Sequence, residues 1–350
     1  MKEIVIFLGV LFFSIQILAE PTGNSSAKLE YLFNVRDFGA KGDGKTDDSA
    51  AIQKTIDAVP RYQGKHWKLG TVFFPPGEYL VSRTISVPSQ MYLEGVHPWS
   101  STIYLAKGTF TDAKKPRAMI AILRGSNGYA DTSFTPGIRN LGFANLGDNP
   151  GGVFVLFNCA QVGHIRDCLF SGGNDTGAVW TCIWIPKGGG NNALIEGCEV
   201  RGGRTGIRVE GHSDGVIFKC SVQHQTEWGI EIYDCYRGIE LISIQGEIYN
   251  KNTGLLKIVN SNVSIIGANL WGEMGSGTKT MIEAVDSDIV AMNLRGRGFQ
   301  YLLMEKNSGI SRTENTPYEP GHDGIPKVFR TIKGNPNGWS NCIFYSSNRP

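Results

Sequence analysis

Apolar and polar residues alternate between Gly206 and Gly298 in four successive segments that share one pattern. Each segment consists of an alternating stretch typical of a β-strand, a short polar turn and a second alternating stretch. Equivalent stretches recur after 23 to 26 residues, a period that is too short for a βαβ unit and suits one coil of a solenoid. The pattern therefore predicts an all-β solenoid. The equivalent stretches begin at Ile207, Ile230, Leu256 and Ile282.

The same alternation predicts which side chains face outward from the coils. In GIRVEG the isoleucine and valine point inward, so Arg208 and Glu210 face outward; in GIEIYD the outward pair is Glu231 and Tyr233. Neighbouring strands of a sheet lie about 4.8 Å apart, so equivalent outward residues of successive coils form a column. Charges of opposite sign alternate along one column. It contains Trp184, Arg208, Glu231, Lys257 and Glu283.

The N-terminus has the features of a secretory signal peptide. Lys2 precedes an apolar run from Ile4 to Leu18, and the small residue Ala19 comes before a polar stretch. The run is shorter than the roughly 20 residues that a membrane-spanning helix needs. We therefore predict a signal peptide over residues 1–19 and a linker over residues 20–30. The mature protein is expected to be secreted, extracellular or periplasmic, with no membrane partner.

Composition and charge support one domain and exclude some partners. The 350 residues include 45 glycines and are 41% hydrophobic, enough for one long core, and the repeat favours a single domain over residues 31–306. A net charge of +2 with both signs interspersed does not indicate nucleic acid or an anionic membrane as a partner. The repeat is lost after Lys306, and we expect residues 307–350 to form an irregular C-terminal cap or tail.

The seven cysteines lack the spacing of a disulfide framework. Cys168, Cys198 and Cys220 each follow an isoleucine by three residues, so they take equivalent positions on consecutive coils. We interpret them as small buried hydrophobes, with disulfides between adjacent coils as the alternative. No CxxC or paired histidine spacing accompanies them, and we expect no metal site.

Two segments before the repeat have a different character. Thr46, Asp47 or Asp48 would cap a short helix with one apolar stripe, and this helix would plug the open end of a solenoid. After it, TVFFPPGEYLVS predicts a strand, a Pro-Pro-Gly turn and a second strand. The apolar stripe consists of Ala51, Ile52, Ile56 and Val59.

These segments, FGAKGDGKTDD and PPGEYLVS, resemble the N-terminal signature of the pectate lyase superfamily. Polygalacturonase-type glycoside hydrolases, several polysaccharide lyases and phage tail-spike proteins share that signature. The resemblance covers Phe33 to about Gly95 as a motif and continues to Glu305 as a repeat. It implies a right-handed parallel β-helix with a short N-terminal capping helix. It does not specify the reaction, because the scaffold carries different chemistries.

The outward column has two interpretations. In the first, its alternating charges form a salt-bridge ladder in which each exposed pair adds less than about 1 kcal/mol. In the second, it is a substrate groove: Trp184 stacks on a sugar, and Arg208 and Lys257 bind a uronate carboxylate. Glu210 and Glu231 would then act as acid and base, because carboxyl pairs about 5 to 9.5 Å apart hydrolyse glycosidic bonds.

Residues beside the column extend the candidate site. Glu227 is a further candidate catalytic carboxylate, Tyr233 a candidate proton-transfer group, and Trp228 and His212 are candidate substrate-binding residues. If the chain were a polygalacturonase-type enzyme, the resemblance would imply four sequence motifs: an NTD turn, a pair of aspartates, a GHG segment and an RIK strand. This chain lacks that series. Its NDTG stretch at Asn174 matches a glycosylation acceptor.

Three functions from different classes follow. The first is a secreted enzyme that depolymerises a polysaccharide, one containing uronic acids, by glycosidic hydrolysis. The second is a polysaccharide lyase acting by β-elimination, in which Arg208, Lys257 and Tyr233 neutralise the uronate and transfer the proton. The third is a non-catalytic glycan-binding or surface β-helix protein. No cofactor is expected, although a lyase would admit calcium.

Overall fold

The computed structural model covers most of the repeat region and short parts of the C-terminal segment. The predicted signal peptide and linker lie outside the described residues. The described residues are 31–60, 70–88, 90–122, 134–174, 177–211, 214–248, 254–272, 278–297, 299–306, 310–313, 330–333 and 339–347.

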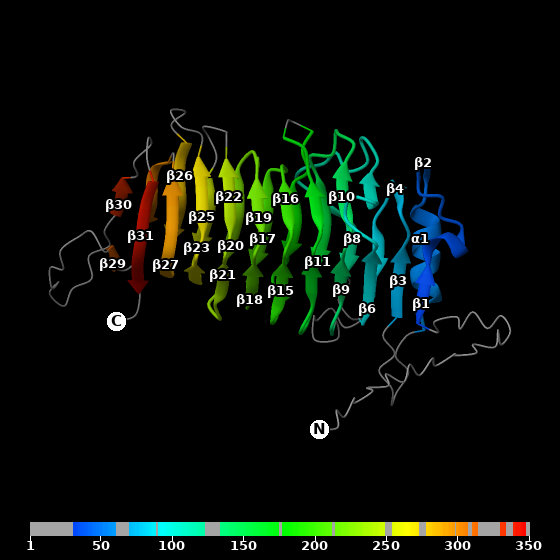
Figure 1. Cartoon of the computed structure of the whole chain (residues 1–350), viewed down its shortest axis with the longest axis horizontal. Coiled ribbons are helices and arrows are strands. Elements are labelled where there is room, and N and C mark those ends of the chain that lie inside the picture. The colour runs from blue at the N-terminus through cyan, green and yellow to red at the C-terminus, as the bar shows by residue number, and fades with distance from the viewer. Residues whose placement is uncertain are drawn as a thin grey trace, which may run out of the picture. The chain divides into compact units, whose positions relative to one another are not determined.

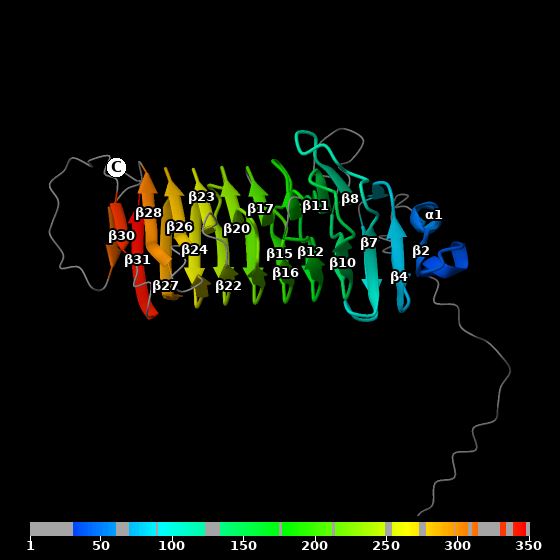
Figure 2. The ribbon, with the colours of Figure 1, turned by 90° about the horizontal axis from the view of Figure 1, so that it is seen from above.

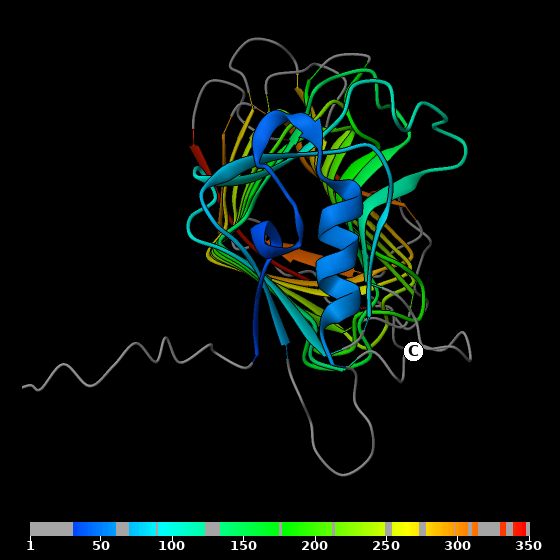
Figure 3. The same cartoon turned by 90° about the vertical axis from the view of Figure 1, so that its right-hand side faces the viewer.

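The described strands from β1 to β28 form a parallel β-solenoid in which successive coils stack along one axis (Figure 1). A complete coil contributes one strand to each of three sheets, which we number 1, 2 and 3 in the order in which the chain passes through them. Strands of one sheet pair in parallel from coil to coil. Figure 3 shows these sheets around a common interior, and Figure 2 shows strands of sheet 3 side by side.

Most strands are three to six residues long, and the longest strand, β27, belongs to both sheet 1 and sheet 2. The strands of sheet 1 are β1 (Leu32–Asn34), β3 (Gly70–Phe74), β6 (Met91–Gly95), β9 (Gly137–Arg139), β12 (His164–Arg166), β15 (Ala193–Glu196), β18 (Gly215–Phe218), β21 (Ile239–Ile242), β24 (Asn262–Ile266) and β27 (Asp288–Arg297). Sheet 2 contains β2 (Asp43–Asp47), β4 (Gly77–Val81), β7 (Ser101–Leu105), β10 (Gly142–Asn145), β13 (Leu169–Ser171), β16 (Glu199–Arg201), β19 (Ser221–Gln223), β22 (Gln245–Ile248), β25 (Asn269–Gly272) and the end of β27. Sheet 3 contains β5 (Ile85–Val87), β8 (Arg117–Ile122), β11 (Gly152–Phe157), β14 (Thr181–Ile185), β17 (Thr205–Glu210), β20 (Trp228–Tyr233), β23 (Gly254–Val259), β26 (Thr278–Val285) and β28 (Phe299–Lys306).

The apolar positions of the repeat line the interior in register, as the alternation predicts. Ile207 pairs with Ile230, Ile230 with Leu256, and Leu256 with Ile282, and all four side chains are buried in one core. Stacking identical or similar side chains removes apolar surface from water on every coil, which contributes about 25 cal/mol for each Å² buried. The predicted solenoid and its period are confirmed.

The corner between sheets 1 and 2 is a single residue in the left-handed region of the backbone. This residue repeats in successive coils, and Asn, Asp, Gly, Ser or Lys occupies it. One left-handed residue reverses the twist sharply enough to turn the chain from one sheet into the next. The corner residues are Asn140, Asp167, Gly197, Lys219, Ser243, Gly267 and Asn293.

Cys168, Cys198 and Cys220 follow three of these corners and point into the core. All three are buried and unpaired as disulfides, which confirms their interpretation as small interior residues. Burial raises the pKa of the Cys198 thiol well above its ordinary value. The Cys198 thiol is therefore an uncharged packing group.

One α-helix, α1 (Ser49–Ala58), follows β2 at the N-terminal end of the described coils (Figure 3). It lies where the sequence predicts a helix, and Ile52 and Ile56 are buried in the core. The Asp48 carboxylate accepts backbone N–H bonds from Lys41 and Gly42 instead of capping the helix. A one-turn 3-10 helix, η1 (Val35–Phe38), precedes β2. That α1 seals the solenoid remains a prediction.

The C-terminal segment, for which the sequence predicts irregular chain, contains strands. These are β29 (Ile310–Thr313), β30 (Arg330–Lys333) and β31 (Trp339–Ser347). β30 pairs antiparallel with β28, and β31 pairs antiparallel with β27. The reversal of direction explains why no repeat marks them: they do not continue the coil but pair with its last strands.

Candidate functional site

The predicted outward column lies on sheet 3, and its members are in register. Trp184 on β14 pairs with Arg208 on β17, and Arg208 pairs with Glu231 on β20. Glu231 then pairs with Lys257 on β23, and Lys257 with Glu283 on β26. Beside the column, Glu210 pairs with Tyr233. Strand pairing therefore brings the proposed catalytic and binding side chains onto one face, which we call the sheet 3 stripe.

Arg208 is the centre of this stripe. Its Nε donates to Glu210 Oε1 at 2.6 Å, and its Nη1 donates to Glu231 Oε2 at 2.9 Å. The guanidinium carbon lies 4.4 Å from the centre of the Tyr233 ring and 5.2 Å from that of the Trp180 ring. Burial lowers the pKa of Arg208, but the hydrogen bond with Glu210 and the charge of Glu231 raise it above its ordinary value. Arg208 is therefore a fixed cation between two carboxylates and two aromatic rings.

Glu231 faces outward from the strand but is covered, with only 6% of its surface exposed. Oε2 accepts hydrogen bonds from Thr205 Oγ1 at 2.8 Å and from Arg208, and Oε1 accepts one from Tyr233 OH at 2.7 Å. Burial raises the pKa of Tyr233 far above its ordinary value, and the hydrogen bond to Glu231 and its charge raise it further. Tyr233 is thus a neutral hydrogen-bond donor.

Lys257 and Trp228 form a second part of the stripe. Lys257 Nζ lies 5.4 Å from the centre of the Trp228 ring. Among the described residues, no carboxylate forms an ion pair with Lys257, although Glu231 and Glu283 flank it in register. A cation beside a flat ring is an arrangement that suits a sugar with a negative charge.

The salt-bridge-ladder interpretation holds for one step of the column only. Arg208 and Glu231 form an ion pair, whereas the described residues show no ion pair at the next two steps. Two separate ion pairs form on sheet 1, where the sequence did not predict them. There Arg139 pairs with Glu94 at 2.7 Å, and Arg166 pairs with Glu196 at 3.1 Å.

The remaining predicted residues lie at the edge of the stripe or outside the described chain. Glu227 precedes β20 and forms an ion pair of 2.7 Å with Arg204. Trp184 packs with Trp180, their ring centres 5.1 Å apart, on a small apolar cluster outside the coils. Its Nε1 is buried without a hydrogen-bond partner among the described residues. His212 lies outside the described residues.

Trp180 and Thr205 belong to the stripe but were not predicted. Trp180 precedes β14, and the alternation of apolar and polar residues begins only within that strand. The alternation therefore does not predict whether the Trp180 side chain faces inward or outward. Thr205 begins β17 and faces outward together with Arg208, although the two are three residues apart. An even spacing is needed to predict a shared face in a regular strand, and the start of β17 departs from it.

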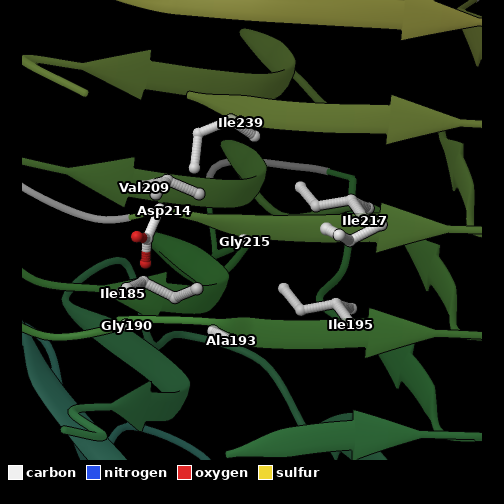
Figure 4. A pocket seen from close by; sticks show the side chains of 10 residues that line it. Ile185, Gly190, Ala193, Ile195, Val209, Asp214, Gly215, Ile217 and Ile239 are labelled. Carbon is white, nitrogen blue, oxygen red and sulfur yellow. The ribbon is translucent and has the colours of Figure 1, made fainter. Parts of the chain in front are cut away.

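The cavity in Figure 4 lies away from the stripe, and its lining is mostly apolar. Ile185, Val209 and Ile217 contribute to its wall, and Asp214 supplies a carboxylate. That carboxylate accepts a hydrogen bond of 2.6 Å from the backbone N–H of Asn192. Among the described residues, no predicted site residue lines the cavity, and we assign it no function.

A comparison with protein families finds one family whose model matches most of the chain. Residues 32–266 match the model of the family described as "Rhamnogalacturonase A/epimerase, pectate lyase-like". The chain belongs to this family. The resemblance seen in the N-terminal motif is therefore confirmed, and the match extends over β1 to β24.

Relatives of this family member carry names of different activities. The chain is 38% identical to alginate lyase 7 of Azotobacter vinelandii over 127 residues, which is 34% of this chain and 13% of that protein. It is 35% identical to mannuronan C5-epimerase AlgE6 of the same organism over 146 residues, 39% of this chain and 15% of that protein. The matched regions are thus small parts of long relatives.

A solved structure confirms the fold independently. The tailspike gp42 of Acinetobacter phage vb_AbaP_AS12 superimposes with a TM-score of 0.52 at 14% identity, over 77% of this chain and 46% of that one. This family member thus shares its fold with a protein of quite different sequence.

Two further properties follow from the described part of this family member. None of its helices there is long and apolar enough to cross a bilayer. Within the described ranges, no three or more His, Cys, Asp and Glu side chains gather in a way that could hold a metal ion.

Proposed function

We propose that this protein is a polysaccharide-acting enzyme whose substrate lies along the sheet 3 stripe. Membership of a carbohydrate-active family supports this proposal, as do relatives named as alginate lyase and mannuronan epimerase. The observation that carries it is the alignment of carboxylates, cations and aromatic rings along one sheet. Aromatic rings bind sugars by stacking, and fixed charged groups beside them orient and activate the bond to be cleaved.

The reaction that we propose is hydrolysis by Glu210 and Glu231. Both accept a hydrogen bond from the Arg208 guanidinium, so they lie side by side on the stripe, and glycosidases use a pair of carboxyl groups for this reaction. Three donors orient the Glu231 carboxylate, and in this proposal it takes the role of proton acceptor. Glu210 is the more exposed carboxylate and takes the role of proton donor to the leaving oxygen.

The substrate that we propose contains uronic acids, and Lys257 and Trp228 form the subsite for one of them. Trp228 offers its ring to the sugar, and Lys257 offers a cation that forms no ion pair in the described chain. Arg208 is less suited to binding the uronate, because it already forms ion pairs with two carboxylates. The charge of the stripe is thus largely compensated, and the negative substrate charge is bound at one place.

Elimination is the second candidate reaction, and the alginate lyase relative favours it. Lys257 would neutralise the uronate, Glu210 would accept the proton from the carbon beside the uronate carboxylate, and Tyr233 would donate its proton to the leaving oxygen as the double bond forms. A non-catalytic glycan-binding protein is the third candidate. The mutual satisfaction of Arg208, Glu210, Glu231 and Tyr233 supports it, because the network also stabilises the fold.

One assay separates these candidates. The protein is incubated with alginate, polygalacturonate, rhamnogalacturonan and β-1,3-glucan, and new reducing ends and ultraviolet absorbance are recorded. Hydrolysis gives reducing ends without absorbance, elimination gives both, and a binding protein gives neither while it still binds. Glu231→Gln and Glu210→Gln are expected to abolish turnover with the circular-dichroism spectrum unchanged. Glu196→Gln on sheet 1, which also loses a partner of an arginine, is the matched control and keeps turnover.

Secretion is part of the same proposal. Expression of the full chain in a secreting host is expected to release a protein whose N-terminus lies near Glu20. Retention of the uncleaved chain in the cell would contradict it.

A further inference from the structure

Trp99 is the most exposed of the large hydrophobic side chains in the described chain, with 65% of its surface accessible. It lies in the short turn between β6 and β7. The backbone N–H groups of Ser100 and Ser101 both bond to the carbonyl of His97 at 2.9 Å, and the Ser101 side chain donates to the carbonyl of Phe74. The turn is thus fixed, and the exposed ring sits on a rigid support.

The turn leans over sheet 2. A β-carbon placed on Gly142 of β10 would lie 2.2 Å from the carbonyl oxygen of Pro98, so the turn rests directly on the neighbouring coil. From there the Trp99 ring reaches Arg201 of β16, whose guanidinium carbon lies 5.7 Å from the ring centre. Three strand spacings of about 4.8 Å separate β7 from β16, so the two side chains bridge several coils.

A row of polar and aromatic residues continues from Arg201 along the outer face of sheet 2. Arg201 pairs with Gln223, Gln223 with Glu247, and Glu247 with Trp271. Their strands, β16, β19, β22 and β25, lie side by side along the axis (Figure 1). The row therefore begins and ends with a tryptophan and carries hydrogen-bonding side chains between them. We call it the sheet 2 row.

We propose that the sheet 2 row is a second, non-catalytic binding site for a polysaccharide chain. The proposal rests on the proposed function for the identity of the polymer only. An exposed tryptophan on a rigid turn provides a platform for a sugar ring, and one guanidinium, one amide and one carboxylate on successive strands provide hydrogen bonds to hydroxyls. The row runs parallel to the sheet 3 stripe because each coil contributes a strand to both sheets.

The charges of the row favour a sugar over a protein or a nucleic acid. Arg201 is paired with Glu199 on its own strand at 2.6 Å, so its charge is compensated. Protein interfaces of stable complexes bury a contiguous apolar core, whereas the residues between the two tryptophans are polar. Nucleic acids need several uncompensated cations. A polysaccharide, whose sugar rings carry hydroxyl groups and apolar faces, matches the hydrogen-bonding side chains and the tryptophans of the row.

The test is electrophoresis of the full chain in native gels that contain each polymer of the panel above. Trp99→Ala is expected to raise the polymer concentration needed for half-maximal retardation about fivefold. Trp99→Phe is expected to bring this concentration most of the way back to the wild-type value. Trp228→Ala in the sheet 3 stripe is expected to weaken retardation independently, and the two changes together to add. Tyr31→Ala, which removes another exposed aromatic ring, is the control and leaves retardation unchanged.

Kinetics separate this proposal from the proposed function. Trp99→Ala is expected to keep the wild-type turnover of short oligosaccharides and to raise the KM for the long polymer. If no polymer is turned over but Trp99→Ala still reduces retardation, the proposed function fails and the second site stands. Retardation of Trp99→Ala equal to wild type in every gel overturns the second site, and so does the absence of retardation of the wild type.

Discussion

The Trp228 ring lies against the backbone of Gly254, its partner on the next coil of sheet 3. A β-carbon at Gly254 would come within 2.0 Å of Trp228 Cζ3, closer than any two such atoms can approach. The glycine thus provides the space in which the indole lies flat beside Lys257. The orientation of the proposed sugar platform depends on a residue that carries no side chain.

Gly254→Ala is therefore expected to displace the Trp228 ring and weaken substrate binding. The loss of one stacking contact corresponds to about 1 kcal/mol, or roughly a fivefold rise in KM. Steady-state kinetics on oligosaccharides measure it. In a Trp228→Ala background the same glycine substitution should change KM no further, and an additional rise there would show that Gly254 acts through something other than Trp228.

Arg208→Ala is expected to destabilise the fold as well as to stop turnover. Removing the guanidinium leaves Glu231 buried without its cation, although Thr205 and Tyr233 still donate to it. We expect a loss of about 2 kcal/mol in the free energy of unfolding, measured by urea denaturation. Arg201→Ala, which breaks an exposed pair, should cost less than about 1 kcal/mol. Equal losses for the two variants would contradict the central role given to Arg208.

Lys257→Met is expected to change affinity and not stability. Lys257 has a ring contact with Trp228 and no ion pair among the described residues, so its removal should cost less than about 1 kcal/mol of stability. Affinity for acidic polymers should fall and lose part of its dependence on salt, because the pair with the uronate is screened by ions. Titrations at two salt concentrations measure both effects. Lys107→Met, on an exposed lysine paired with Asp148, is the control and should bind like the wild type.

His164 on sheet 1 predicts a dependence of stability on pH. Burial lowers the pKa of His164 below its ordinary value of 6.5, and the charges of Arg166 and Arg139 lower it further. Between the two values the unfolded chain binds a proton that the folded chain does not, so stability rises with pH. The melting temperature should thus fall as the pH drops below about 6.5. His164→Gln should reduce this slope, and an unchanged slope would assign it to other groups.

Sequence reasoning succeeded where a period of two was preserved. Ile207, Ile230, Leu256 and Ile282 stack because each begins an equivalent strand, and the register of Arg208 with Glu231 follows from the same alignment. Alternation specifies the face on which a side chain lies. It does not specify what covers that face, so the burial of Glu231 beneath Arg208 and Tyr233 could not be predicted.

Other features depend on contacts that no period encodes. Trp180 reaches the stripe from the segment before β14, and its place is determined by packing against Trp184 and Arg208. The strands β30 and β31 run antiparallel to the coils, so they share no repeat with them. The ion pairs of Glu94 with Arg139 and of Arg166 with Glu196 join residues in strands before the clear repeats begin.

Each complete coil adds one strand to each of the three sheets, so the three sheets have nearly the same length along the axis. A duplication or deletion of one coil would lengthen or shorten the sheet 3 stripe and the sheet 2 row together, by the same axial step. Evolution can therefore change the number of sugar units that the two surfaces span, but it cannot adjust one surface without the other. The reversed strands at the C-terminal end restrict such changes to the interior of the stack.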